Sequence, residues 1–519
     1  MTNSAPARVT LGTLAGVVGF LAFVEFTSGV LQGYYTPLLT NIARHLGIHD
    51  ADVNWLEGTQ LMLSALVVPA FAKLGDMIGH KRMLLISTAL TGLASLVLPF
   101  TDNFGIFLAG WALMGFYVVW LPLEIALIWS RSRRMQGRAT ITARAAGILV
   151  AALETGAIVG ALVGGALGDI LPLWIVLLVP SVMIVICFFV VLFGVKESPD
   201  TTGGVFDTVG LVLISLALIA FTGGLSLLRI NGPADILSWL VVILGIALVG
   251  PFVLWELRHK DPLIDVRMFR SPALGPVFLT AGLFGVSVLG AQGPLSTFAR
   301  TDPTVYGYGL GASEFVVSLL VGGYVIFSLL GALAFPLVAR TTTPRLSLII
   351  ATSFVAVGYL LFLPFHHSTG QLLTNMAIAG LGSGALVAAL PSAAAAAAPT
   401  GRTAVATGLT NTTKTIGGTF ASATFALALS AGVHTTLGGA EGTAGSLSGY
   451  MTVWAVCGLT AVVAALCLVV IPRLAFADRS SDAAASPTDE PGAAGDHLAG
   501  AVDVAGDDEP GGERTGVRA

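Results

Sequence analysis

The chain has 519 residues, of which 55% are hydrophobic and only 10% are charged, with a mean hydropathy of +0.87. Ordinary soluble domains carry about 25% charged residues, so this composition excludes a soluble globular protein and indicates a polytopic membrane protein. The formal net charge of -4 says little about partners, because 10 of the 29 acidic residues lie from Asp478 onward.

The two ends of the chain differ in character. The first apolar run is longer than the hydrophobic core of a signal peptide, and no small-residue cleavage site interrupts it, so we expect this span to remain in the mature protein. Residues 476–519 are acidic, rich in Gly, Ala and Pro and almost free of aromatic residues, which predicts a disordered tail. The three cysteines all fall in apolar runs, which favours core packing over a disulfide framework or a metal site.

About 20 apolar residues are needed to cross a bilayer as a helix, and charges, prolines and glycines divide the chain into fourteen such runs. In chain order the predicted spans are 11–35, 53–73, 83–100, 104–129, 142–168, 171–195, 206–228, 237–257, 272–297, 314–338, 346–365, 371–396, 404–432 and 450–472.

The basic residues test this count, since Lys and Arg collect in cytoplasmic loops. With both termini inside, 21 of the 25 basic residues fall on the inner side. The outer side receives Arg44, Arg229 and Arg300, and Lys414 lies within a span. One miscounted helix would scramble this partition, so the sequence predicts fourteen spans in the plasma membrane with both termini cytoplasmic.

A very short loop joins the second and third spans and reads AKLGDMIGHKRMLL over residues 72–85. Glycine permits the tight turn, and Lys81 and Arg82 favour the inner side. The Asp76 carboxylate can meet the positive end of the following helix or a basic partner. The alternative is a charged turn that merely obeys the positive-inside rule.

This loop resembles the signature of the major facilitator superfamily. Its matching residues are Asp76, Gly79, Lys81 and Arg82, and the sequence departs from the family pattern at Ala72 and Met77. The resemblance implies a loop that acts as a conformational latch between helices.

The fifth span contains GILVAALETGAIVGALVGGAL, residues 147–167, in which one glutamate lies among repeated glycines. At about 100° per residue, Gly156, Gly160 and Gly164 form one stripe, and Glu154 projects about 100° away from its middle. A neighbouring backbone can approach such a stripe closely. Packing and charge are therefore expected on different faces of this helix.

The same span resembles the superfamily's antiporter signature, which implies an exporter. Only the signature's proline is replaced, by Ala161. Ordinary small-residue helix packing remains compatible with the pattern. The matching glycines are Gly147, Gly156, Gly160, Gly164 and Gly165.

The run from 205 to 273 resembles the insert of fourteen-helix members of the family. The resemblance implies an all-α membrane protein of the drug:proton antiporter branch, with two six-helix bundles plus two inserted helices, 14 transmembrane helices in all. The implied parts are an N-terminal bundle, an insert with its flanking loops, a C-terminal bundle and the tail. Their ranges are 1–198, 199–271, 272–475 and 476–519.

One departure bears on the mechanism. Members of that branch usually have an arginine in the fourth span, in a pattern like Arg-x-x-x-Gly. The matching stretch of this chain reads WALMG, so Trp111 stands where the arginine would be. The family arginine is associated with proton coupling. Either the proton path uses other groups here, or transport is driven differently.

Charges deep in a span cost roughly 2.5 to 3.5 kcal/mol each, so each should face a cavity or a partner. Glu25, Glu154 and Glu124 are the candidates for proton coupling, by alternate protonation and exposure. Glu154 and Lys414 lie at similar depth in the fifth and thirteenth spans, which pseudo-symmetry relates. We expect these two to face a shared central cavity and to pair when substrate is absent. The alternative for each is a structural, paired charge.

Polar and aromatic neighbours give that cavity a candidate lining, since sites for amphipathic organic molecules are mostly apolar with a few placed polar groups. The alternative for each is an interhelical hydrogen bond or an interfacial anchor. The candidates are Gln32, Tyr34, Glu57, Gln60, Trp111, Trp120, Gln292, Asn375, Asn411 and Lys414.

The sequence contains no phosphate-binding loop, His-Glu-x-x-His array or nucleophile elbow. We therefore expect no enzymatic activity, cofactor, bound metal, ATP hydrolysis or nucleic-acid partner, and a chain that works as a monomer. The predicted function is secondary active export of amphipathic organic compounds in exchange for protons by alternating access. An uptake carrier, an uncoupled facilitator and a non-transporting membrane sensor remain alternatives.

Overall fold

The structure is a computed structural model that describes residues 11–132, 138–197, 205–260, 262–398, 403–431, 436–437 and 442–470. The predicted acidic tail, residues 476–519, lies outside the described residues.

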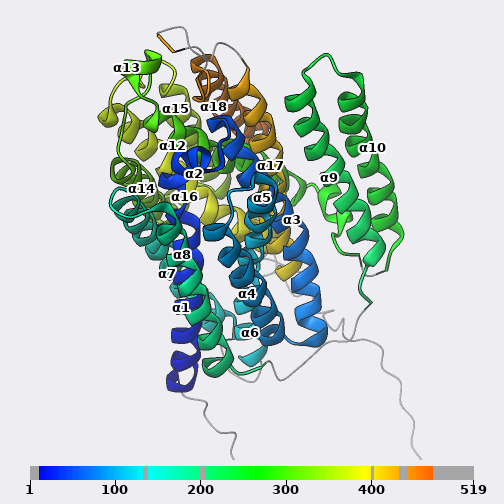
Figure 1. Cartoon of the computed structure of the whole chain (residues 1–519). Helices are drawn as coiled ribbons and strands as arrows, with labels where there is room; N and C mark the ends of the chain where they lie inside the picture. The colour runs from blue at the N-terminus through cyan, green and yellow to red at the C-terminus, as the bar shows by residue number, and fades with distance from the viewer. Residues whose placement is uncertain are drawn as a thin grey trace, which may run out of the picture. The chain divides into compact units, whose positions relative to one another are not determined.

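The described chain consists of α-helices and short 3-10 turns (Figure 1). We call α1 to α8 the N-terminal half, α9 and α10 the insert, and α11 to α18 the C-terminal half. The end of the bundle where α2 and α13 lie, at the top of Figure 1, is called the α2 end. The helices are α1 (Leu11–Tyr34), α2 (Leu39–Leu46), α3 (Val53–Ile78), α4 (His80–Val97), α5 (Phe104–Met114), α6 (Trp120–Arg131), α7 (Arg138–Gly168), α8 (Leu173–Gly194), α9 (Thr208–Asn231), α10 (Ile236–Arg258), α11 (Gly275–Val288), α12 (Gln292–Arg300), α13 (Pro303–Tyr306), α14 (Glu314–Thr341), α15 (Pro344–Leu361), α16 (Thr369–Ala397), α17 (Thr403–Ser430) and α18 (Leu447–Val470).

Twelve helical segments of the described chain are long and apolar enough to cross a membrane. They confirm twelve of the fourteen predicted spans. The other two, α15 and α17, are helices, but α15 is shorter and the threonines, Asn411 and Lys414 dilute the apolar residues of α17. A polar helix needs protein around it in a bilayer, and α17 packs against α3, α11, α16 and α18. That α15 and α17 cross the membrane stays a prediction.

Two of the spans are broken in the middle. α5 and α6 are separated by a 3-10 turn over Gly115–Val119, and α11 and α12 by one over Leu289–Ala291. At the first break α3 lies very close to the backbone of Gly115. A Cβ on Gly115 would lie 2.6 Å from the Gln60 carbonyl oxygen. The break thus allows α3 to pack tightly against the middle of the fourth predicted span.

The predicted glycine stripe of α7 packs against α1. A Cβ on Gly156, Gly160 or Gly164 would collide with the backbone of Phe26, Val30 and Tyr34 in turn. This close backbone approach is what small residues provide in membrane helices. These three glycines therefore lie on the face of α7 that is closest to α1.

The other two glycines of that signature behave differently. Gly165 faces α14 of the other half, where its Cβ would lie 2.6 Å from the Glu314 carbonyl oxygen. Gly147 makes no such close approach, since a Cβ there would meet no atom of a described neighbouring residue within 4 Å. Gly147 lies near the end of α7 away from the α2 end, where the helix face is exposed.

Two matched substitutions on α7 test this packing. Gly160→Ala places a methyl group 2.6 Å from the Val30 carbonyl oxygen, and we expect it to lower the free energy of unfolding by about 1 to 3 kcal/mol. Gly147→Ala enters open space, so its stability should stay equal or rise by up to about 1 kcal/mol. Thermal unfolding of the purified variants measures both, and equal losses in the two variants would contradict the packing.

The insert stands beside the junction of the two halves. In Figure 1, α9 faces α3 and α17, and both neighbours contact it. The Phe221 ring packs on Phe420 of α17 at a centroid distance of 4.2 Å, and Arg229 lies 3.3 Å from the Asp52 carboxylate at the start of α3. The insert therefore touches both halves. The predicted division of the chain into bundles stays a prediction.

Candidate functional site

Two glutamates are buried inside the N-terminal half. The side chains of Glu25 on α1 and Glu124 on α6 are both fully buried, and their carboxyl oxygens accept no hydrogen bond from a described residue. The two groups lie near enough for the charge of Glu25 to act on Glu124. Since two adjacent unpaired carboxylates are strongly unfavourable in such surroundings, this pair is suited to holding a proton.

A third glutamate extends this cluster toward the C-terminal half. Glu57 of α3 lies beside Gly293 of α12, whose Cβ position is 3.0 Å from the Glu57 Oε2 atom. The buried Tyr117 lies near both groups, since the charges of Glu57 and Glu25 act on its hydroxyl group. Tyr117 thus lies near two of the three buried glutamates, and the sequence did not single it out.

Glu154 and Lys414 lie near one another between the halves. Each acts electrostatically on the other, and both are half-buried. Between these two described residues no nitrogen to oxygen contact within 4.0 Å is found. Tyr324 of α14 lies in the same neighbourhood. The structure therefore brings the two predicted charges together without a direct ion pair.

An aromatic stack occupies the place of the family arginine. Trp111 is buried, and its ring packs edge-on against Tyr35 at 5.0 Å and stacks on Phe107 at 5.9 Å. Its indole N–H donates to no described residue. Trp111 therefore supplies an aromatic ring and no cation at this position.

The candidate lining residues fall into two groups. Tyr34 donates its hydroxyl proton to the Val176 carbonyl oxygen at 2.8 Å, and the Asn375 amide donates to the Phe365 carbonyl oxygen at 2.7 Å. These two side chains make interhelical and loop hydrogen bonds, as the alternative interpretation expected. Of the others, Trp120 is fully buried, Gln32 is exposed on α1, and the half-buried ones are Gln60, Gln292 and Asn411.

The loop between α3 and α4 turns on Gly79, which has φ of +113°. Asp76 lies 3.1 Å from His80, so the carboxylate meets a basic partner. The start of α4 is capped instead by Glu197, which accepts hydrogen bonds from the backbone N–H groups of Lys81 and Arg82 at 2.9 and 3.1 Å. Anionic groups are favoured at a helix N-terminus. The loop thus ties α4 to the segment after α8.

Lys81 of this loop makes a second contact with α8. Its ammonium group donates to the Leu192 carbonyl oxygen at 2.8 Å, one of the last carbonyls of that helix. Arg82 reaches back to the Ile78 carbonyl oxygen at 3.5 Å. All these contacts lie within the N-terminal half.

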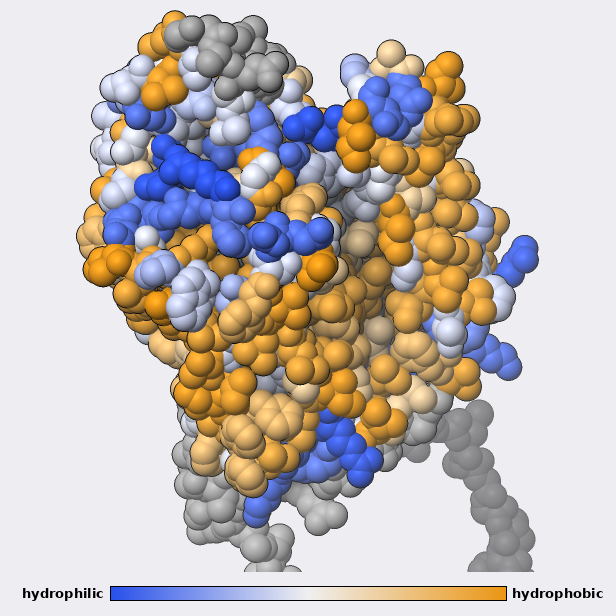
Figure 2. All heavy atoms as spheres, viewed as in Figure 1, coloured by the Kyte–Doolittle hydropathy of each residue, from blue (hydrophilic) through white to orange (hydrophobic). Residues whose placement is uncertain are grey.

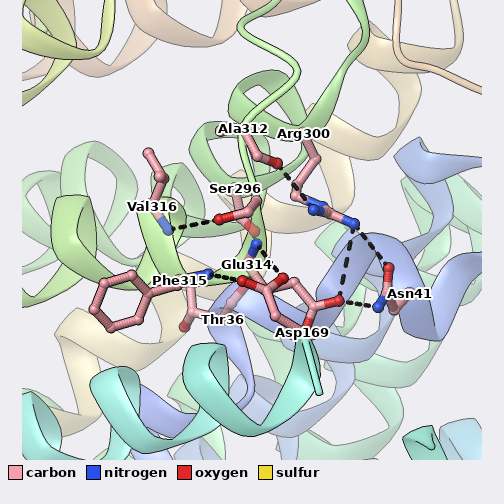
Figure 3. Close-up of polar contacts among 10 residues, drawn as sticks. Thr36, Asn41, Asp169, Ser296, Arg300, Ala312, Glu314, Phe315 and Val316 are labelled. Atoms are coloured by element: carbon pink, nitrogen blue, oxygen red, sulfur yellow. Dashed lines mark hydrogen bonds and ion pairs between the residues drawn. The ribbon is translucent and has the colours of Figure 1, made fainter. Parts of the chain in front are cut away.

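A polar network joins the two halves at the α2 end (Figure 3). The Arg300 guanidinium donates to the Asn41 side-chain oxygen at 3.0 Å and to the Ala312 carbonyl oxygen at 2.9 Å, and lies 3.8 Å from the Glu314 carboxylate. The Asn41 amide also donates to Glu314. Arg300 is 14% exposed and Glu314 only 2% in their side chains, so this charge pair is shielded from water.

Asp169, the first residue after α7, caps α14 of the opposite half. Its two carboxylate oxygens accept from the backbone N–H groups of Glu314 and Phe315 at 3.0 and 3.1 Å (Figure 3). Next to it, the Ser296 hydroxyl donates to the Thr36 carbonyl oxygen at 2.6 Å. Between the described residues of the two halves, the hydrogen bonds lie at the α2 end.

The described residues contain no cluster of three His, Cys, Asp or Glu side chains placed to hold a metal ion.

Comparison with known proteins agrees with this architecture. The family model described as the Major Facilitator Superfamily matches residues 21–422. The multidrug efflux pump LfrA of Mycolicibacterium smegmatis is 25% identical over 370 residues, 70% of each chain. The multidrug resistance protein Stp of Mycobacterium tuberculosis is 24% identical over 438 residues, 80% of this chain and 77% of that protein.

Solved structures show the same fold at low identity. A POT family transporter in complex with 5-aminolevulinic acid is 17% identical with a TM-score of 0.66, covering 89% of this chain and 96% of that one. The nucleoside transporter NupG is 16% identical with a TM-score of 0.61, covering 88% and 99%. With the family model matching more than three quarters of its length, the chain belongs to the major facilitator superfamily.

Proposed function

We propose that the protein exports amphipathic organic compounds, with preference for cations, in exchange for protons by alternating access. The observation that carries this proposal is the pair of buried, unpartnered carboxyl groups of Glu25 and Glu124, separate from the half-buried charges of Glu154 and Lys414 between the halves. One site is suited to the proton and the other to the substrate. The relatives named as efflux pumps support export.

The proposed orientation places both termini in the cytoplasm. It follows from the 21 to 3 partition of basic residues between the two sides. In this orientation the α2 end faces outward, and the Arg300 network closes it. The conformation described here is then closed to the outside. Export requires this network to break when the halves rock.

The charges of the central site support a preference for organic cations. Glu154 is a carboxylate on the path between the halves, and Tyr324 offers an aromatic face beside it. Cations are attracted to both kinds of group. Lys414 opposes this attraction, and its proximity to Glu154 keeps the site from holding an unpaired charge when empty.

Two substitutions at the central site should act in opposite directions. Glu154→Gln removes the attractive charge and should weaken binding of an organic cation by about tenfold. Lys414→Met removes the repulsive charge and should tighten the same binding by about tenfold. Binding of a fluorescent organic cation to the purified chain measures both, and changes of equal sign would remove these two residues from the substrate site.

Transport direction is tested in inverted membrane vesicles with an acidic lumen. An exporter coupled to protons accumulates the organic cation in the lumen, and a proton ionophore abolishes the accumulation. An uptake carrier would expel the compound under the same gradient. An uncoupled facilitator would only equilibrate it, and a sensor would leave vesicles with and without the protein indistinguishable.

A further inference from the structure

We propose that the insert carries a binding site for one acidic phospholipid at the end of α10. A pocket of about 480 Å³ opens on the surface of the insert there. Five of its six lining residues lie on the last turns of α10 or directly after it, and one lies on α9. They are Leu213, Pro251, Leu254, Trp255, Arg258 and His259.

The pocket has an apolar body and a cationic rim. Leu254 is 56% exposed and Trp255 38% exposed, although both are large apolar side chains. They belong to a segment, Ile236–Arg258, that is long and apolar enough to cross a membrane. Figure 2 shows the surface of the insert as mostly hydrophobic along its length. An acyl chain is the occupant that such a surface meets in a bilayer.

Internal contacts hold the aromatic wall in place. The Trp255 indole N–H donates to the Asp207 carboxylate at 2.9 Å, and the His259 ring lies 3.8 Å from the other oxygen of that group. The two rings stack with their centroids 5.8 Å apart. Asp207 itself is 3% exposed, so its negative charge does not face a ligand. The wall is therefore formed before any ligand binds, which lowers the cost of binding.

Arg258 supplies the charge that selects the headgroup. It is the last residue of the span, which places it at the boundary between hydrocarbon and water. Its side chain is exposed and donates to no other described residue. By contrast, the Arg267 guanidinium donates to the Leu257 carbonyl oxygen at 2.6 Å and braces the chain after α10. A basic group beside an apolar pocket at this depth favours an anionic lipid headgroup.

Among the described residues, the acidic side chains of the loop after α10 and of its last turn do not oppose this charge. Glu256 is fully buried and lies 3.4 Å from the Ile264 backbone N–H. Asp265 is 5% exposed and accepts from the Arg267 backbone N–H at 3.2 Å. Both carboxylates are thus turned toward the loop after α10 and away from the rim. A zwitterionic lipid also offers a phosphate to Arg258 but brings a cation of its own, so the net attraction favours an acidic lipid.

Thermal unfolding of the purified full chain in detergent tests the site. Phosphatidylglycerol should raise the Tm of the wild type by about 5 °C at saturation. Phosphatidylcholine with the same acyl chains and inorganic phosphate should leave it unchanged. Arg258→Ala should remove the rise, as should Leu213→Trp, which fills the pocket without changing its charge. Arg270→Ala is the matched control, since Arg270 is an exposed cation of the neighbouring loop outside the pocket.

Three outcomes overturn the proposal. A rise that persists in Arg258→Ala and Leu213→Trp places the lipid elsewhere. Equal losses in Arg258→Ala and Arg270→Ala show diffuse attraction of acidic lipid to the basic loop. A rise with phosphatidylcholine or with phosphate alone shows that an acidic phospholipid is not what binds.

Discussion

Glu25→Gln and Glu124→Gln are expected to abolish proton-driven transport while leaving substrate binding intact. The charged form of a carboxyl at the centre of a span costs about 2.5 to 3.5 kcal/mol, which is roughly a hundredfold in a population. In the proposed exchange the proton removes this cost for the crossing without substrate, and bound substrate drives the opposite crossing with the pair deprotonated. Glutamine is neutral throughout, and the conformational change no longer depends on pH.

The measurement is uptake into proteoliposomes, with and without a pH gradient. Each variant should lose proton-driven accumulation by about a hundredfold and retain exchange of labelled for unlabelled substrate. Glu256→Gln is the matched control, because Glu256 is equally buried but lies in the insert. Accumulation that persists in both single variants would remove the pair from proton coupling.

Arg300→Ala is expected to open the α2 end. The guanidinium joins three groups of the network, and its removal leaves the Glu314 carboxylate buried without its cation. Removing one partner of a buried charge pair costs about 3 to 5 kcal/mol. This cost raises the free energy of the conformation closed at the α2 end. The open conformation avoids it, because Glu314 is then exposed to water. The population should therefore shift toward the open conformation by a factor of about 100 or more.

Cysteine labelling reports this shift. A cysteine introduced at Thr36, which is 5% exposed at the α2 end, should react with a membrane-impermeant maleimide much faster in the Arg300→Ala background. Arg44→Ala should give a much smaller rise, since Arg44 is an exposed cation of α2 at the same end whose charge acts on Glu314 without contacting it. Equal labelling rates in the wild-type and Arg300→Ala backgrounds would show that the network does not hold this end closed.

The helices were largely predictable because bilayer thickness and hydropathy leave few choices for an apolar chain. α17 shows the limit of this prediction. Its threonines and Lys414 make it too polar for the hydropathy criterion, and only its neighbours in the folded chain cover them. Hydropathy depends only on the residues of the helix itself, so it does not show that neighbouring helices will cover the polar ones.

The candidate charges were predictable one by one, but their grouping was not. Glu25 and Glu124 are each unusual in an apolar run, yet nothing in the sequence shows that α1 and α6 bring them together. For Glu154 and Lys414 the sequence did predict proximity. Pseudo-symmetry relates their two helices, and the two side chains lie at similar depth in them. Tyr117 was missed because a single aromatic residue in a span is ordinary.

The network at the α2 end was not predicted. Asn41, Asp169 and Glu314 lie at helix ends, where polar residues normally face water, so no local pattern distinguishes them. Arg300 carried the one available signal, as one of only three basic residues expected on the outer side. Glu197 was missed for a similar reason. It caps α4 from a segment more than a hundred residues away, and no local pattern marks it as a cap.

The exchange of substrate for protons is tested most directly by measuring proton movement itself. Purified protein is reconstituted into proteoliposomes that enclose a pH-sensitive dye, with no pH gradient imposed. A gradient of an organic cation should then drive protons in the opposite direction, and Glu25→Gln should stop the proton movement. Substrate flux with no proton movement, or with protons moving in the same direction as the substrate, would contradict proton-coupled export.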